Sequence, residues 1–151
     1  MNIEIDFFAH QSKLKLRRDE KTGKQQVFDP VRKKFVAWQP EESVRQLFLQ
    51  YLLYEKNCNP NKVRVEKQLI VNGLQKRCDI LIYDSSFRPV WLVECKAPNI
   101  DINQAVFEQI ARYNLPLQVQ FLIVTNGLKN YICEMDYDKK TFIFLDKIPN
   151  F

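Results

Sequence analysis

Two stretches of the chain carry apolar residues at helical spacing. In the first, apolar side chains recur at i, i+3, i+4, i+7 and i+8, which places them on one face of a helix. These residues are Val44, Leu47, Phe48, Tyr51 and Leu52. The helix is predicted to run from Pro40 to about Lys56, because a proline and two acids suit a first helical turn. A second helix is predicted over 100–114. Its stripe consists of Ile102, Val106, Ile110 and Tyr113.

Apolar runs bounded by turn residues predict the strands. They cover 63–71, 76–83, 90–96 and 121–125, followed by a closing hairpin of 131–135 and 141–145. Turns are predicted at Asn72-Gly73, at Asn126-Gly127 and between Asp84 and Pro89. Before residue 40 the sequence predicts short strands at 14–16 and 26–28 around a turn at 19–24. An extended segment is predicted at 31–38.

This order of elements predicts an α/β fold in which helices flank a mixed β-sheet. The order is α-β-β-β-α-β with an added C-terminal β-hairpin. Because the second helix crosses over between the third and fourth strands, those two strands are predicted to be parallel. A chain of 151 residues suits one domain, 1–151, with 1–39 as a basic N-terminal preamble and 40–149 as the core.

The composition is that of a folded globular protein, with 46% hydrophobic residues and no apolar run long enough for a membrane span. The first residues lack a signal-peptide pattern and the four cysteines are widely spaced, so we expect reduced thiols in a cytoplasmic protein. Since His10 is the single histidine, a hard-metal site would have to consist of carboxylates. The net charge of +5 is compatible with a polyanionic partner and equally with a plain solvated surface.

The predicted strand 90–96 contains two charged residues, Glu94 and Lys96, in an otherwise apolar run. Residues i and i+2 of a strand share a face, so these two lie side by side while Cys95 points the other way. If this strand pairs with 76–83 around the turn between them, Asp79 lies opposite Glu94.

Directly opposed carboxylates repel each other unless something positive lies between them. An oxygen-ligated divalent cation would supply that charge, since Mg²⁺ binds through a few carboxylates and keeps several waters. Lys96, two residues along, could orient or deprotonate a metal-bound water and stabilise developing negative charge, which suits phosphodiester hydrolysis. The spacing alone equally allows a simple ion pair between Glu94 and Lys96 with Asp79 as a neighbour.

Asp79 followed by Glu94-Cys95-Lys96 resembles the motif of the PD-(D/E)XK nuclease superfamily, with Cys78 in place of the proline. The segments 109–113 and 40–46 are similar to the Q-x-x-x-Y and acidic-helix motifs of the RecB-like branch. Over nearly the whole chain, an ordered set of segments resembles the N-terminal domain of type I restriction enzyme R subunits. These segments are 29–34, 40–45, 76–80, 94–98, 109–114 and 125–127.

The resemblance implies a restriction-endonuclease-like core and an endonuclease that depends on Mg²⁺, with Mn²⁺ as a substitute. Asp79 and Glu94 would then hold the metal together with the backbone carbonyl of Cys95, and Lys96 would be the catalytic lysine. Gln109 and Tyr113 would approach the substrate or support the site. A polar helix residue and a core-edge tyrosine would explain these two equally well without the resemblance.

The first helix offers two acids to the site. Glu41 lies on the flank of the stripe that faces the sheet and Glu42 points roughly opposite, so we prefer Glu41 as the catalytic acid. Either acid could instead be a first-turn residue favoured by the helix dipole. Arg45 is expected to pair with Glu41 or to contact phosphate. Further phosphate contacts are expected from the preamble, through Arg32, Lys33 and Lys34.

The function expected on this basis is restriction-type cleavage of DNA, with other restriction-modification subunits as further partners and no membrane. R subunits also contain motor domains that use ATP. This sequence has no G-x-x-x-x-G-K-[ST] loop and only three glycines, so it does not contain that motor. Two alternatives stay open: a non-catalytic nucleic-acid-binding or assembly module that keeps the fold, and a nuclease acting on RNA or on repair intermediates.

Overall fold

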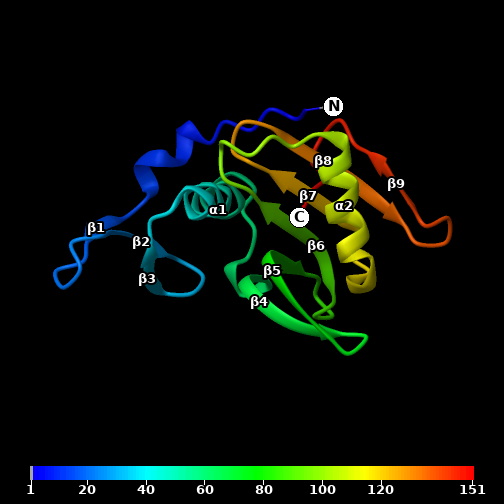
Figure 1. Ribbon diagram of the computed structural model, residues 1–151, viewed down its shortest axis with the longest axis horizontal. Helices are drawn as coiled ribbons and strands as arrows, with labels where there is room; N and C mark the ends of the chain where they lie inside the picture. Colours follow the sequence, from blue (N-terminus) through cyan, green and yellow to red (C-terminus); the bar gives the residue numbers. More distant parts are fainter. Residues whose placement is uncertain (1) are drawn as a thin grey trace.

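The computed structural model describes residues 2–151 and arranges them around two β-sheets (Figure 1). A six-stranded sheet has the order β4-β5-β6-β7-β8-β9, and a three-stranded sheet has the order β1-β2-β3. The strands of the large sheet are β4 (Val63–Val71), β5 (Leu74–Tyr83), β6 (Pro89–Cys95), β7 (Phe121–Thr125), β8 (Asn130–Asp136) and β9 (Thr141–Phe144). Those of the small sheet are β1 (Leu16–Arg18), β2 (Gln25–Asp29) and β3 (Lys34–Ala37). Within residues 2–151, no helix is long and apolar enough to cross a membrane.

Two α-helices accompany the large sheet. Helix α1 spans Pro40–Gln50 and continues as a π-helical turn, η2, over Tyr51–Glu55, whereas α2 spans Gln104–Asn114. Three short 3₁₀ segments complete the chain: η1 (Phe8–Lys13), η3 (Pro60–Lys62) and η4 (Leu115–Leu117). After residue 40 the order is therefore α1-β4-β5-β6-α2-β7-β8-β9, apart from the short helical turns.

The two α-helices cover opposite faces of the large sheet (Figure 1). On β6, Val93 packs in the cluster that contains Phe48 of α1, while its neighbour Leu92 packs in the cluster that contains Phe107 of α2. This alternation follows from the two-residue period of a strand and recurs on β7 and β8. Strands that are buried on both faces read as continuous apolar runs, which is why the sequence predicted β7 without error in its bounds.

The strand pairing agrees with the prediction in both respects that matter for the site. Strands β6 and β7 are parallel, with Trp91 opposite Phe121. Strands β5 and β6 are antiparallel in the predicted register, in which Ile80 lies opposite Val93. The register shifts beside the turn, between Ile82 and Tyr83. The shift lies at the far end of the hairpin and leaves the end that carries Asp79 unaffected.

The predicted helix ends were less accurate. The second helix was predicted from residue 100, but α2 begins at Gln104 because the side chain of Asn103 caps it by accepting a hydrogen bond from the Val106 N–H at 2.9 Å. Ile102 is still buried, from the loop before the cap. The first helix changes to π-helical geometry after Gln50, with a bond from the Lys56 N–H to the Tyr51 carbonyl at 3.0 Å.

The preamble forms the small sheet, with its first strand two residues later than predicted. The extended segment predicted at 31–38 is wrong in its first half. The Asp29 carboxylate accepts hydrogen bonds from the Val31 N–H at 2.8 Å and the Arg32 N–H at 2.7 Å, which closes a turn between β2 and β3. This turn brings Asp29 and Arg32 against α1, where they contribute to the site described next.

Candidate active site

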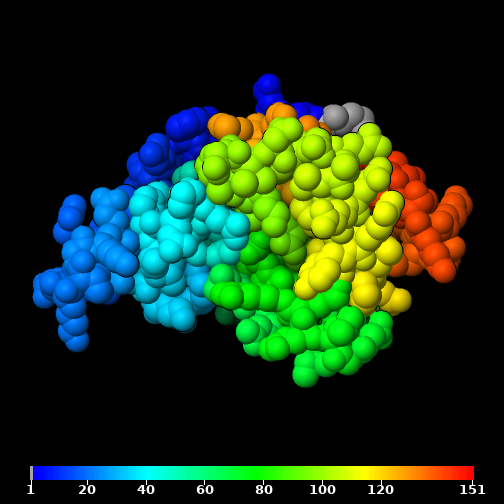
Figure 2. All heavy atoms as spheres, in the orientation of Figure 1, coloured from blue at the N-terminus to red at the C-terminus, as the bar shows by residue number. Residues whose placement is uncertain are grey.

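Three of the residues singled out in the sequence lie close together: Asp79 on β5, Glu94 on β6 and Lys96 just after β6. Strand β6 ends at Cys95, whose backbone N–H donates to Asp79 Oδ2 at 2.7 Å. The Lys96 N–H donates to the Thr125 carbonyl at 2.8 Å and so extends the pairing with β7 by one residue. Figure 2 shows the β5 and β6 region in green, with α1 in cyan on one side and α2 in yellow on the other. Asp79, Glu94 and Lys96 are therefore brought together by the sheet itself.

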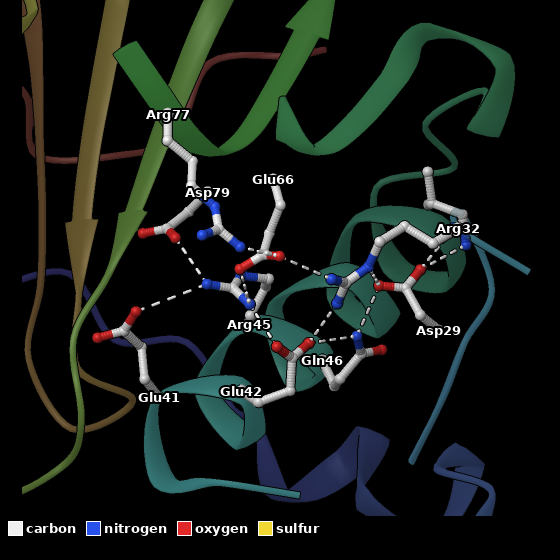
Figure 3. Close-up of polar contacts among 10 residues, drawn as sticks. Asp29, Arg32, Glu41, Glu42, Arg45, Gln46, Glu66, Arg77 and Asp79 are labelled. Carbon is white, nitrogen blue, oxygen red and sulfur yellow. Dashed lines mark hydrogen bonds and ion pairs between the residues drawn. The ribbon is translucent and has the colours of Figure 1, made fainter. Parts of the chain in front are cut away.

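An irregularity in β4 lies directly beside Asp79. Val65 pairs with Ile80 and Lys67 pairs with Cys78, but Glu66 between them has a φ of +50° and does not join the ladder. A positive φ at a residue other than glycine is uncommon and interrupts strand pairing. The interruption lets the carboxylates of Glu66 and Asp79 both face helix α1 (Figure 3).

Glu94 is mostly buried and has no ion-pair partner within 4 Å among residues 2–151. Its Oε1 accepts a long hydrogen bond from Asn114 Nδ2 at 3.5 Å. Burial, together with the negative charge of Asp79, raises the pKa of Glu94 to about 8, and Lys96 acts in the opposite direction. This carboxyl is therefore mostly buried without a close positive partner.

The pKa of Glu94 predicts how the stability of the metal-free protein depends on pH. The carboxyl titrates near 4.5 in the unfolded chain and at about 8 in the folded protein, so folding favours its protonated form between those values. Unfolding then releases a proton, and the free energy of unfolding falls as the pH rises from about 4.5 to about 8. Urea unfolding at several pH values in EDTA would measure this slope. Glu94→Gln should flatten it, and an equally steep slope in this variant would contradict the assignment.

Arg45 is the cation nearest to Asp79, and only 3% of the residue is exposed. Its Nη2 lies 2.7 Å from Asp79 Oδ1 and 3.5 Å from Glu41 Oε1. Its Nη1 lies 3.3 Å from Glu66 Oε1 and also pairs with Glu42. Burial acts to lower the pKa of Arg45, but Asp79 and Glu42 outweigh it, so the pKa lies above its ordinary value and the guanidinium stays charged.

Behind Arg45 lies a second group of buried charges that the sequence did not reveal (Figure 3). Arg32 pairs with Asp29 at 2.7 Å, with Glu42 at 2.7 Å and with Glu66 at 3.1 Å. Gln46 donates to Asp29 Oδ2 at 2.8 Å and to Glu42 Oε1 at 2.9 Å. We call these five residues, together with Arg45, the arginine network. The sequence contained one signal for part of this network. Glu42, Arg45 and Gln46 stand at i, i+3 and i+4 on the first helix, beside its apolar stripe.

The network bears on two expectations from the sequence. Glu41, half exposed, lies near Asp79 and Lys96, and burial together with Asp79 raises its pKa, whereas Glu42 is buried among arginines. This placement favours Glu41 over Glu42 beside the site. Arg32 and Arg45 face carboxylates, which favours a structural role over the phosphate contacts expected of them.

The other predicted residues lie on the surface. Lys33 and Lys34 are exposed at the turn between β2 and β3, and Gln109 is exposed on α2. Tyr113 is 54% exposed, and the ammonium of Lys76 lies 3.9 Å from the centre of its ring. Lys76 is itself 4% exposed, and burial lowers its pKa. The sequence analysis gave Lys76 no role. The sequence signal that could have revealed its role was a lysine within a predicted strand next to the predicted site.

The described residues offer few ligands for a metal. Among residues 2–151, no three His, Cys, Asp or Glu side chains form a group that could hold a metal ion. Burial raises the pKa of the Cys78 thiol to about 12, and the four cysteines are free and buried. The carboxylates of Asp79 and Glu94 fit a hard cation such as Mg²⁺, which takes few protein ligands and keeps its waters. Of the expected ligands, Cys95 would contribute its backbone carbonyl.

The fold defines a class: an α/β domain with a mixed sheet and a helix on each of its faces. Residues 40–149 match the family model of the N terminus of the type I restriction enzyme R protein. The chain belongs to this family. The match begins at the first residue of α1 and includes Asp79, Glu94 and Lys96.

A solved structure supports the fold. It is the fragment of a protein described as an HsdR subunit of a type I restriction enzyme from Vibrio vulnificus YJ016. The two chains superpose with a TM-score of 0.52 and 24% sequence identity, over 74% of this chain and 24% of the other. The present chain thus spans about a quarter of the length of that protein. A search among curated proteins gives no match.

Proposed function

We propose that this chain is the endonuclease domain of a restriction system and hydrolyses DNA phosphodiester bonds with Mg²⁺. The observation that carries the proposal is the proximity of Asp79, Glu94 and Lys96 where the pairing of β5 with β6 ends, in a chain of the R-protein family. Two acids and a lysine close together are groups that suit metal-assisted phosphodiester hydrolysis. Lys33 and Lys34, exposed beside α1, would add contacts to DNA phosphates.

Each residue would have a definite task in this reaction. Asp79 and Glu94 would hold the cation, which when bound lowers the pKa of a water molecule and neutralises charge on the phosphate. Lys96 would place its ammonium beside the reacting phosphate, where it stabilises the negative charge that develops there. The hydrogen bond from the Cys95 N–H would fix the orientation of the Asp79 carboxylate. Glu94 would hold the cation in its charged form, which burial and the neighbouring Asp79 disfavour in the absence of a cation.

The partners of the domain follow from the same proposal. The chain spans a quarter of the solved relative, so DNA translocation and sequence recognition would fall to other parts of a restriction complex. We propose DNA and other restriction-modification subunits as partners, in the cytoplasm. Gln109 and Tyr113 lie on the exposed side of α2 and would meet the nucleic acid there.

One experiment tests the central step. Calorimetric titration with Mg²⁺ or Mn²⁺ should give binding to the wild-type chain, and Asp79→Asn should weaken it by about 10-fold or more because it removes a charged ligand. Nicking of supercoiled plasmid in Mg²⁺ should be lost in the same variant. Asp138→Asn, an exposed carboxylate in the turn between β8 and β9, is the matched control and should leave both unchanged. If Mn²⁺ does not bind at millimolar concentration even with DNA present, the enzymatic proposal fails.

One observation favours a second candidate, a nucleic-acid-binding or assembly module without turnover. Both oxygens of Asp79 are already engaged, Oδ1 by Arg45 at 2.7 Å and Oδ2 by the Cys95 N–H at 2.7 Å. A carboxylate neutralised by arginine is a weaker metal ligand. This candidate predicts DNA binding, measured by fluorescence anisotropy, that neither EDTA nor Asp79→Asn alters. The nuclease proposal predicts tighter DNA binding when Mn²⁺ replaces EDTA in a Lys96→Ala chain.

A further inference from the structure

The guanidinium of Arg45 occupies the gap between two carboxylates of the candidate site. Its Nη2 lies 2.7 Å from Asp79 Oδ1 on β5 and 3.5 Å from Glu41 Oε1 on α1 (Figure 3). A bridge between carboxylates from two elements is the position that a divalent cation takes in many proteins. Here a side chain of the protein supplies the positive charge.

The position of Arg45 is fixed from behind. Its Nη1 pairs with Glu42 and lies 3.3 Å from Glu66 Oε1, while Glu42 and Glu66 are also held by Arg32 at 2.7 Å and 3.1 Å. Arginine does not lose its charge in proteins, and its planar fork keeps one orientation when both ends are bound. Moving Arg45 out of the gap would take from Asp79 its ion-pair partner, which is costly for a carboxylate that is largely buried.

Glu94 contrasts with Glu41 and Asp79 in this respect. Among residues 2–151 no lysine, arginine or histidine nitrogen lies within 4 Å of its carboxylate. Asn114 Nδ2 donates a long hydrogen bond to its Oε1, at 3.5 Å. On the Glu41 side of Asp79 a guanidinium is thus in direct contact, whereas on the Glu94 side the positive charge of Lys96 acts from more than 4 Å away.

We propose that Arg45 takes the place of a second metal ion, so that the site binds a single divalent cation, between Asp79 and Glu94. This inference rests on the proposed function and goes beyond it, because it sets the metal stoichiometry and the part played by Glu41. A second cation held by Asp79 and Glu41 would meet the guanidinium, whose Nη2 lies 2.7 Å and 3.5 Å from their oxygens, and the two positive charges would repel. Glu41 is then a positioning residue that holds Arg45 rather than a metal ligand.

The test counts metal ions on the full chain in the absence of DNA. Calorimetry with Mn²⁺ should give one ion per wild-type chain, and electron paramagnetic resonance should give the spectrum of an isolated ion. Arg45→Met, which removes the charge and keeps the length, should bind a second ion and show the magnetic coupling of two ions about 4 Å apart. Arg45→Lys keeps the charge and should still bind one. Glu41→Gln should also still bind one, because Glu41 is not a ligand.

The outcomes separate this inference from the proposed function. Two coupled ions in the wild-type chain would overturn the inference and leave the nuclease proposal standing. No bound ion at millimolar Mn²⁺, first without DNA and again with DNA added, would overturn both. A folded Arg45→Met that still binds one ion would show that Arg45 does not exclude the second and would also overturn the inference. If Arg45→Met does not fold, the number of ions bound by the wild-type chain and by Glu41→Gln still tests the inference. Loss of the ion in Glu41→Gln would show that Glu41 is a metal ligand and would overturn the inference.

Discussion

Replacing Lys96 by alanine is expected to lower the rate of plasmid cleavage by about 10²- to 10⁴-fold, the usual contribution of one positioned charge or proton donor to a transition state. Lys96 directly follows β6, two residues from Glu94, and its charge partly offsets the rise in pKa that burial and Asp79 cause at both Glu94 and Glu41. No acid among residues 2–151 forms an ion pair with it within 4 Å. Its ammonium is therefore available to the substrate.

In the Lys96→Ala chain, activity should fall while stability stays nearly unchanged. A half-buried lysine without an ion pair contributes little to folding, so the free energy of unfolding should change by less than about 1 kcal/mol. Lys147→Ala, at an exposed lysine far along the chain, is the matched control for lost positive charge. Initial rates of supercoiled plasmid nicking in Mg²⁺ would measure the effect. If the Lys96→Ala chain cleaves at the wild-type rate, Lys96 has no part in the mechanism.

The part of the fold that the sequence predicted is the part that local chemistry determines. Strand β4 begins and ends as predicted because apolar residues lead into Asn72-Gly73, where both residues have positive φ. The register of β5 and β6 followed from the short turn between Asp84 and Pro89. Once that register is known, Asp79 and Glu94 must lie near each other at the end of the hairpin. The acid-acid-lysine set was accordingly visible before any coordinates.

The arginine network was not visible, because it depends on contacts between elements far apart in the sequence. Glu66 reaches Arg45 only because its backbone leaves the ladder at a φ of +50°, and no residue type near it signals that conformation. Arg32 looked like a surface arginine in a basic segment. It is placed against α1 by the turn that Asp29 closes, and the docking of the small sheet then buries it. Periodicity shows which face of an element is apolar, but it does not show which distant charge will face it.

The second large effect concerns the stability of the fold. Replacing Glu42 by alanine should lower the free energy of unfolding by about 3 kcal/mol or more, because it leaves buried arginines without their shared partner. Glu42 accepts hydrogen bonds from Arg32 at 2.7 Å, from Gln46 at 2.9 Å and from Arg45. The two arginines keep other carboxylate partners in this variant, namely Asp29, Glu66 and Asp79. The loss of free energy of unfolding is therefore smaller than for an isolated buried charge.

Glu41 provides the comparison, since it is the adjacent acid on the same helix. Its side chain is 48% exposed and its one ion pair, with Arg45, spans 3.5 Å. Glu41→Ala should therefore cost less than about 1 kcal/mol, as exposed pairs usually do. Urea unfolding followed by circular dichroism would give both values, and the m-value should stay constant if only the native state changes.

The structure predicts unequal losses of free energy of unfolding for Glu42→Ala and Glu41→Ala. Two adjacent acids in the first turn would contribute alike if each acted only through the helix dipole, by at most about 1 kcal/mol apiece. Equal and small losses would therefore mean that the arginine network does not hold α1 against the two sheets. A large loss at Glu42 with a small one at Glu41 would show that the two acids have different roles. Glu42 would then hold the scaffold, and Glu41 would face the site, as expected from the position of Arg45 between them.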